Sequence, residues 1–262
     1  MNALCVPAGP QAGDARSLAV AGTFRADRRA LPAAGSSVSL HRLRRRVIVK
    51  YQPDHFRAHD LPQMRALMRA RPFATLISAG SAGLQATHLP TVLRDDEPDG
   101  IIECHLARAN PHWKDLAEGN EALLIFHGPE GYITPNWYPS KAEHGKVVPT
   151  WNYAVVHAYG RPEMINDKTW LRNHVAALTA QQERSEATPW ALSDAPESYI
   201  EVMLRGIVGF RIAITRLEGK WKMSQNREMR DREGVASGLR QRGEGDDLAV
   251  AGLVVPPVIS SG

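Results

Sequence analysis

The residues around Arg108 are the ones best suited to holding a phosphate. Arg108 and Asn110 follow an apolar run that begins at residue 101, and Pro111 comes next. Asparagine is a good helix N-cap and proline suits the first helical turn, so we expect a helix to begin here. A guanidinium beside the N–H groups of a helix start can clamp a phosphate. Residues 105–113 therefore indicate the phosphate end of a ligand site, with an ordinary capped helix as the alternative.

Three more stretches carry polar or aromatic groups suited to a flat ligand. The first precedes Pro90 on an expected strand, which must lie at an edge or bulge because proline cannot donate a ladder hydrogen bond. The second ends an aromatic loop, and the third is a polar turn. An edge strand, a loop and a turn without a ligand remain the alternatives. The candidates are, in chain order, Thr87, His88 and Leu89, then Ser140 and Lys141, then Gln225, Asn226 and Arg227.

Trp151, Asn152 and Tyr153 begin a stretch rich in β-branched and aromatic residues, which predicts a strand over residues 151–159. We expect Gly160-Arg161-Pro162 to end it. Side chains two apart share a face of a strand. The odd-numbered residues therefore place three aromatic rings and a histidine on one face, and the even-numbered ones are mostly small and apolar. Such a strand can present rings to a planar ligand, and a buried core strand is the alternative.

The sequence carries no self-contained catalytic motif. It has no zinc spacing of Cys and His, no HExxH, no G-x-S-x-G and no P-loop. No nucleophile–base pair is evident, and His105 is expected to be a hydrogen-bonded core histidine rather than a metal ligand. We therefore predict neither catalytic residues nor a metal site. Any redox chemistry would need a cofactor.

The elements that must position these residues are mainly strands. We expect strands at residues 73–78, 84–93, 101–107, 121–127, 131–134, 207–217 and 219–224, and helices at 64–70, from 110 to about 119, 166–184, 196–204 and 231–242. Strand and helix do not alternate regularly, so a doubly wound sheet is disfavoured. The pattern predicts an α+β fold, mainly antiparallel β, in which helices flank a closed or partly closed barrel.

Charge and composition divide the chain into three parts. Residues 1–50 carry a net charge of +7 and residues 51–262 a net charge of −3, so the charge of the body gives no reason to expect DNA binding. Residues 1–46 are expected to be a disordered basic extension, with a transit peptide or a misplaced start as alternatives. Residues 47–243 form the folded domain, and 244–262 a flexible tail. With Cys5 and Cys104 alone and no long apolar run, we expect a cytoplasmic protein without a membrane span.

From residue 51 to about 242 the chain resembles the PaiB-like family of FMN-binding negative transcriptional regulators. The matching motifs are YQPDHF (51–56), THLP (87–90), HLARANPHW (105–113), YITPNWYPSK (132–141), VPTWNY (148–153), GIVGF (206–210) and SQNR (224–227). They occur in family order over most of the body. Family chains usually begin with Met directly before the tyrosine, and Lys50 stands there in this chain.

The resemblance implies a Greek-key FMN-binding split barrel that forms a homodimer, with FMN in a groove between subunits. It places Arg108 and Asn110, together with Ser140 and Lys141, at the FMN phosphate. It assigns backbone groups of Thr87, His88 and Leu89 to the isoalloxazine edge. It places Trp151, Asn152 and Tyr153 beside the ring. It also implies that Gln225, Asn226 and Arg227 close the site.

Three functions follow from this sequence. The first is an FMN-binding split-barrel protein of the PaiB regulator type. The second is a flavin-dependent oxidoreductase or flavin reductase. The third is a DNA-binding regulator in which the flavin is incidental, although no recognition-helix motif is visible.

Overall fold

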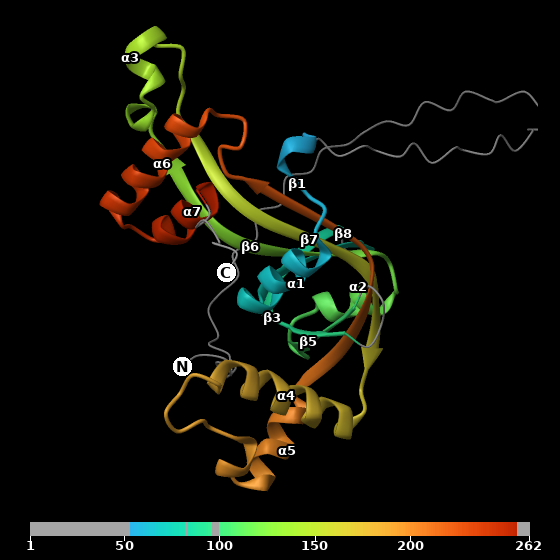
Figure 1. Cartoon of the computed structure of the whole chain (residues 1–262). Helices are drawn as coiled ribbons and strands as arrows, with labels where there is room; N and C mark the ends of the chain where they lie inside the picture. Colours follow the sequence, from blue (N-terminus) through green and yellow to red (C-terminus); the bar gives the residue numbers. More distant parts are fainter. Residues whose placement is uncertain (1–52, 82, 96–99, 256–262) are drawn as a thin grey trace, which may run out of the picture. The chain divides into compact units, whose positions relative to one another are not determined.

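The computed structural model describes residues 53–81, 83–95 and 100–255. The expected N-terminal extension at residues 1–46 lies outside the described residues. Within the described residues, the strands form one antiparallel sheet in the order β3-β2-β6-β7-β8-β5-β4, with β1 paired to β8 (Figure 1). The strands are β1 (Arg57–Ala58), β2 (Phe73–Gly80), β3 (Gly83–Pro90), β4 (Val92–Arg94), β5 (Ile101–Ala107), β6 (Ala122–Ile133), β7 (Thr150–Ile165) and β8 (Ile207–Lys222).

The sheet curls into a split barrel. β3 and β4 are the two ends of the strand order, and β3 also approaches β5. This confirms the predicted α+β class with mainly antiparallel strands. It also confirms that Pro90 lies on an edge strand, where its missing N–H leaves no ladder bond unmade.

Two irregularities make long strands look broken in the sequence. β6 is one strand where two were predicted, with an extra residue between His127 and Glu130 where Pro129 interrupts the ladder. β8 is likewise one strand, and its register with β7 shifts at Thr215. In each case the bulge changes which residues face inward, so the alternation of the sequence breaks although the strand continues.

β7 is longer than predicted. The expected stop at Gly160-Arg161-Pro162 is wrong, because β7 runs to Ile165. A Cβ at Gly160 would lie 2.3 Å from the carbonyl oxygen of Ala213 on β8. The glycine therefore permits close approach of two backbones rather than a turn. Conversely, the single predicted strand at 84–93 is two strands, because Thr91 turns aside to donate through N and Oγ1 to the carbonyl of Pro72.

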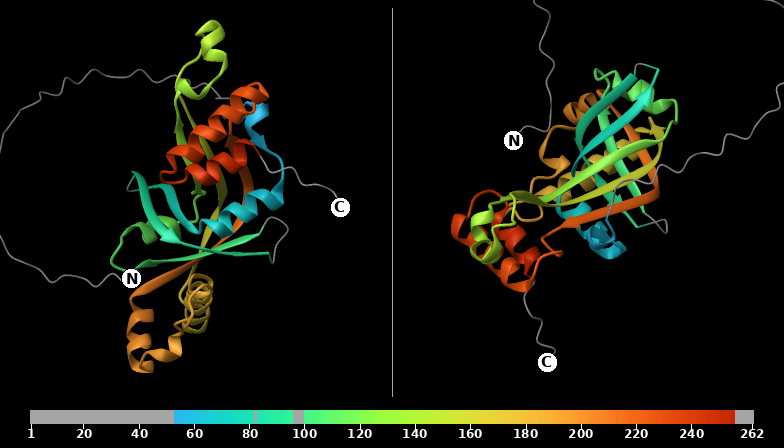
Figure 2. Two further views of the ribbon diagram at one scale, coloured as in Figure 1. Left: turned by 60° about the vertical axis from the view of Figure 1, so that its left-hand side comes forward. Right: turned by 90° about the horizontal axis from the view of Figure 1, so that it is seen from above.

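Helices pack around this sheet. α1 contacts β1, β4, β6 and β7, and α2 contacts β2, β3 and β7. α4 follows the end of β7 and packs with α5, whereas α6 packs with α7, and α7 packs against β6 (Figures 1 and 2). The helices are α1 (Leu61–Ala70), α2 (His112–Ala117), α3 (Ser140–His144), α4 (Lys168–Glu183), α5 (Glu197–Arg205), α6 (Met229–Arg242) and α7 (Asp247–Val254), with 3₁₀ turns η1 (Asp54–Phe56), η2 (Pro135–Trp137) and η3 (Leu192–Asp194).

The prediction of a flexible tail from residue 244 is wrong for residues 247–254, which form α7. Val250, Ala251 and Val254 are fully buried in the main core. Arg242 holds the start of this helix, because its guanidinium binds both carboxylate oxygens of Asp247 at 2.6 and 2.7 Å. Within the described residues, no helix is both long and apolar enough to cross a membrane.

Candidate functional site

The first group of predicted site residues surrounds α2 and β3. It comprises Thr87, His88, Leu89, Arg108 and Asn110. Asn110 Nδ2 donates to Thr87 Oγ1 at 3.1 Å, so the structure brings β3 and the segment before α2 together. His112 contacts the same hydroxyl, because its Nδ1 is 2.8 Å from Thr87 Oγ1. Sequence reasoning named neither this contact nor Ser78, which binds the other nitrogen of the His112 ring.

The remaining members of the first group differ in exposure. Leu89 is buried in the main core, so only its backbone can serve a ligand. His88 is exposed, with Nδ1 3.0 Å from Thr75 Oγ1. Arg108 is also exposed, and it donates through Nε to the carbonyl of Arg205 at 3.0 Å and through Nη2 to Asn166 Oδ1 at 2.7 Å. Two of its three nitrogens are thus oriented by the chain, and among the described residues Nη1 has no hydrogen-bond partner.

The second group lies where β7 begins and β8 ends. It comprises Ser140, Lys141, Trp151, Asn152, Tyr153, Gln225, Asn226 and Arg227. The fully buried Asn152 links β7 to the turn after β8, because its Nδ2 donates to Ser224 Oγ at 3.0 Å. Ser224 has a φ of 61°, in the left-handed region, and this contact helps to hold it there.

The turn after β8 is fixed by its own side chains. Gln225 Nε2 donates to the carbonyl of Trp221 at 2.5 Å, and its Oε1 accepts from the N–H of Met223 at 2.6 Å. The Arg227 guanidinium lies over the ring of Tyr138 at 4.8 Å, and Asn226 is exposed. Burial raises the pKa of Tyr138, an effect that Arg227 opposes. Arg227 and Asn226 are therefore the members of this turn that can reach a ligand.

Ser140 and Lys141 are both engaged within the chain. Ser140 is buried, and its N–H and hydroxyl donate to the two carboxylate oxygens of Asp231 at 3.1 and 2.7 Å. Burial acts to raise the pKa of Asp231, but the two bonds from Ser140 and the nearby arginines leave that pKa lower than usual. Lys141 Nζ donates to Asn136 Oδ1 at 2.6 Å and is exposed. Lys141 thus remains accessible, whereas Ser140 fastens the loop to α6.

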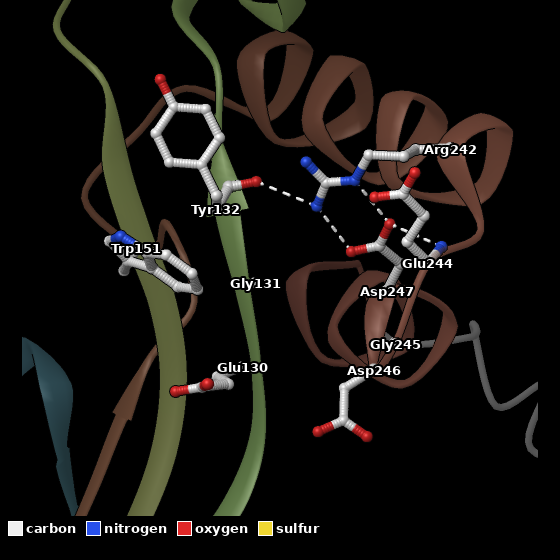
Figure 3. Close-up of a pocket in the computed structure, with 9 residues that line it drawn as sticks. All are labelled: Glu130, Gly131, Tyr132, Trp151, Arg242, Glu244, Gly245, Asp246 and Asp247. Atoms are coloured by element: carbon white, nitrogen blue, oxygen red, sulfur yellow. Dashed lines mark hydrogen bonds and ion pairs between the residues drawn. The ribbon is translucent and has the colours of Figure 1, made fainter.

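A pocket of about 470 Å³ opens beside Trp151 (Figure 3). Trp151 is 52% exposed, and its ring meets that of Tyr132 edge to face at 6.0 Å. Arg242 is the only cation among the lining residues, and Asp247 neutralises it. Sequence reasoning missed this pocket, because it depends on α7. Its lining residues are Glu130, Gly131, Tyr132, Trp151, Arg242, Glu244, Gly245, Asp246 and Asp247.

The two groups lie at different positions along β7. The second group includes Trp151 at its start, whereas β2 and β3 join the sheet where β6 pairs with His157 and Tyr159. At about 3.3 Å per residue, the six steps from Trp151 to His157 span about 20 Å. A single chain therefore does not bring the two groups together.

One face of the sheet connects them. The alternation predicted for residues 151–159 is confirmed, since the even-numbered side chains are buried and the odd-numbered ones stay partly or well exposed. The register aligns neighbouring side chains into rows across this face, such as Ile77, Leu123 and Tyr159, or Thr75, Ile125 and His157. We call this the outer face. It is largely apolar in the middle, and β8 contributes Arg216, Glu218, Lys220 and Lys222 at its side.

Comparison with known proteins agrees with this architecture. The family described as "Putative FMN-binding domain" matches residues 50–216. The chain is 36% identical over 227 residues to an uncharacterized protein of Emericella nidulans, which covers 73% of this chain and 90% of that protein. It is 29% identical over 190 residues to the protease synthase and sporulation protein PAI 2 of Bacillus subtilis, covering 72% of this chain and 89% of PAI 2.

Among solved structures, the FAD and heme binding protein of Mycobacterium smegmatis superposes with a TM-score of 0.50 over 70% of this chain and 80% of that one, at 18% identity. That likeness concerns the fold alone. The fold is thus that of the split-barrel flavoproteins. By the match over residues 50–216, the chain belongs to the family described as "Putative FMN-binding domain".

Proposed function

We propose that this protein binds FMN as a homodimer, in two equivalent sites that each combine the first group of one protomer with the second group of its partner. The observation that carries the proposal is the separation of the two groups along β7 in a single chain. A two-fold axis through the outer face would place the first group of each protomer against the second group of its partner. An isologous interface contains every contact twice, so the dimer would hold two such sites.

The outer face supports such a dimer. Its central side chains, among them Ile77, Leu123, Ile125 and Val155, are apolar yet only partly buried in one chain. A contiguous apolar surface of this kind on a folded domain marks an interaction site. The same face of a second copy would present its own apolar side chains to this surface, together with the charged side chains of β8 at its side.

The residues present fit a flavin phosphate. Arg108 is exposed and already oriented, and Lys141 and Arg227 are accessible cations of the second group. The acidic pocket beside Trp151 is unsuited to the phosphate, because Glu130 and Glu244 would repel it and Asp247 already pairs with Arg242. The phosphate is therefore assigned to the Arg108 side and the aromatic ring system to the free edge of β3, where the outer face ends.

Bound FMN would supply redox chemistry that the side chains cannot. The chain's own residues bind and orient it: Arg108 holds negative charge, the Thr87 strand presents hydrogen-bonding groups, and Trp151 offers a ring for packing. These roles follow the family resemblance and the contacts described above.

The first test is a titration of the purified full-length chain with FMN, followed by flavin fluorescence and visible absorption, with molar mass measured by light scattering. We expect one FMN per chain and the mass of two chains. A monomer, or a protein that leaves the FMN signal unchanged, contradicts the proposal.

A second test asks whether both chains build each site. Arg108→Ala and Trp151→Ala alter exposed side chains and should each weaken FMN binding. Co-expressed together, the two variants form mixed dimers in which one of the two sites is intact. Random pairing then restores tight binding at roughly a quarter of all sites. If each site lies within one chain, co-expression restores nothing.

A further inference from the structure

His112 is a buried histidine to which the proposed function assigns no role. It is 1% exposed at the start of α2, and each ring nitrogen lies 2.8 Å from a hydroxyl oxygen. Nε2 faces Ser78 Oγ on β2, and Nδ1 faces Thr87 Oγ1 on β3. The ring therefore ties two neighbouring strands to the helix, and the positions of its protons decide what each hydroxyl can do.

Asn110 fixes one of those positions. Its Oδ1 accepts from the N–H of His112 at 3.1 Å, which orients the amide so that Nδ2 donates to Thr87 Oγ1. One of the two lone pairs of the Thr87 hydroxyl is thereby occupied. Burial also lowers the pKa of His112, although nearby Asp115 opposes this, so the ring is neutral at pH 7 and carries a single proton.

Two tautomers are then possible, and burial distinguishes them. Ser78 is 4% exposed, and among the described residues its hydroxyl contacts only His112 Nε2. If Nε2 carried the proton, the Ser78 hydroxyl would be a buried donor without an acceptor, which is costly. If Nδ1 carries the proton, Ser78 donates to Nε2 and His112 donates to Thr87. The second arrangement satisfies every buried group.

In that arrangement the Thr87 hydroxyl accepts from both Asn110 and His112. Its lone pairs are filled, so its own proton must go to a third group. Thr87 is only half-buried, which leaves it able to reach an acceptor outside the chain.

We propose that His112 is a positioning residue that holds the Thr87 hydroxyl as a hydrogen-bond donor toward a carbonyl or ring-nitrogen acceptor of the bound flavin. The inference rests on the proposed FMN site beside β3, and it adds which group of the chain donates and which residue fixes the direction.

The test uses the full chain, free FMN and variants that replace one half of the imidazole at a time. In His112→Asn the amide can stand near Nδ1 and still donate to Thr87. In His112→Gln it reaches toward Ser78 instead. We expect Thr87→Val and His112→Gln each to weaken FMN binding about tenfold and to shift the visible flavin band, because one hydrogen bond is lost. Thr87→Ser and His112→Asn should stay within about threefold of wild type.

A double-mutant cycle separates positioning from a merely structural role. Because His112 acts through Thr87, His112→Gln should add no further loss in the Thr87→Val background. Additive losses, equal losses in both His112 variants, or unchanged binding by Thr87→Val would overturn the inference. Unfolding midpoints are compared with those of His59→Gln, an exposed histidine outside the site. If wild type binds FMN and these variants bind it equally well, only this inference fails. If wild type does not bind FMN, the proposed function fails first.

Discussion

His105 and His174 join the sheet to α4 through their rings. Nδ1 of His105 lies 3.0 Å from Nε2 of His174, and Trp170 stacks on His174 at 5.1 Å. The sequence predicted a hydrogen-bonded histidine at 105, which is confirmed. It could not identify the partner, because His174 lies 69 residues away on a helix whose packing against β5 no local pattern encodes.

This pair makes stability depend on pH. Burial lowers the pKa of His105 from 6.5 to about 4, and His174 adds to the effect. Between those values the unfolded chain binds a proton at His105 that the folded chain does not bind. The stability that His105 contributes is therefore fully present above pH 6.5 and is lost as the pH falls toward 4. Urea unfolding should show a slope of up to about 1.4 kcal/mol per pH unit in this window. His105→Gln should flatten it, and an unchanged slope would exclude His105 as its source.

Glycines in α6 shape the docking of the aromatic loop. A Cβ at Gly238 would lie 2.3 Å from the ring of Trp137, so the ring packs directly on the helix backbone. The Arg242 guanidinium covers the same ring at 5.0 Å. The sequence alone indicates a glycine in a polar helix and a tryptophan in a loop, without any sign that the two are in contact.

The predicted cost of filling this space is testable against a control in the next helix. Gly238→Ala should lower the free energy of unfolding by about 2 kcal/mol, because overpacking outweighs the better helix propensity of alanine. Gly252→Ala, where nothing lies within 4 Å, should raise it by about 0.5–1 kcal/mol. Denaturant unfolding measures both, and the same sign for the two variants would contradict the packing argument.

Element boundaries could be predicted where local chemistry sets them. β5 matches its predicted bounds, and Asp167 caps α4 by accepting from the N–H of Trp170 at 2.7 Å. The failures come from long-range contacts. α7 is short and its stability depends on burial against α6 and β6, so composition alone suggested a tail.

Removing α7 should therefore be harmful. A chain that ends at Gly243 loses the buried Val250, Ala251 and Val254 and leaves the facing part of the core exposed, which should cost at least about 3 kcal/mol. Leu248→Ala, at a 65% exposed position of the same helix, should change stability by no more than about 0.5 kcal/mol. Thermal unfolding compares them, and identical midpoints for full-length and shortened chains would show that α7 adds nothing.

For the whole molecule, the sequence motifs predicted the family, which the comparison confirms, and they named the residues of both groups, whose role in a site stays a prediction. They could not show how one chain keeps those groups apart, because their separation of about 20 Å along β7 depends on the pairing of β6 with β2 and β7. The site as a whole is therefore a property of the assembly that we propose.

The outer face provides the test at this scale. Ile125→Asp puts a charge at a partly exposed position of one chain, which the monomer tolerates but an apolar interface does not. We expect the mass of a single folded chain by light scattering and FMN binding weakened at least tenfold. Thr169→Asp, on the exposed surface of α4, should keep the mass of two chains. A dimeric Ile125→Asp protein would place the interface elsewhere.

The register shift at Thr215 has a consequence for how the chain can change in length. Before it, Ile212 and Ile214 face inward; after it, Leu217, Gly219 and Trp221 do. Removing Thr215 alone would leave each of these side chains on its present side and would only straighten the strand. A one-residue deletion elsewhere in the paired part of β8 would move the side chains that precede or follow the deletion to the opposite face of the sheet. Related chains that differ in length within β8 should therefore gain or lose their single residue at this position.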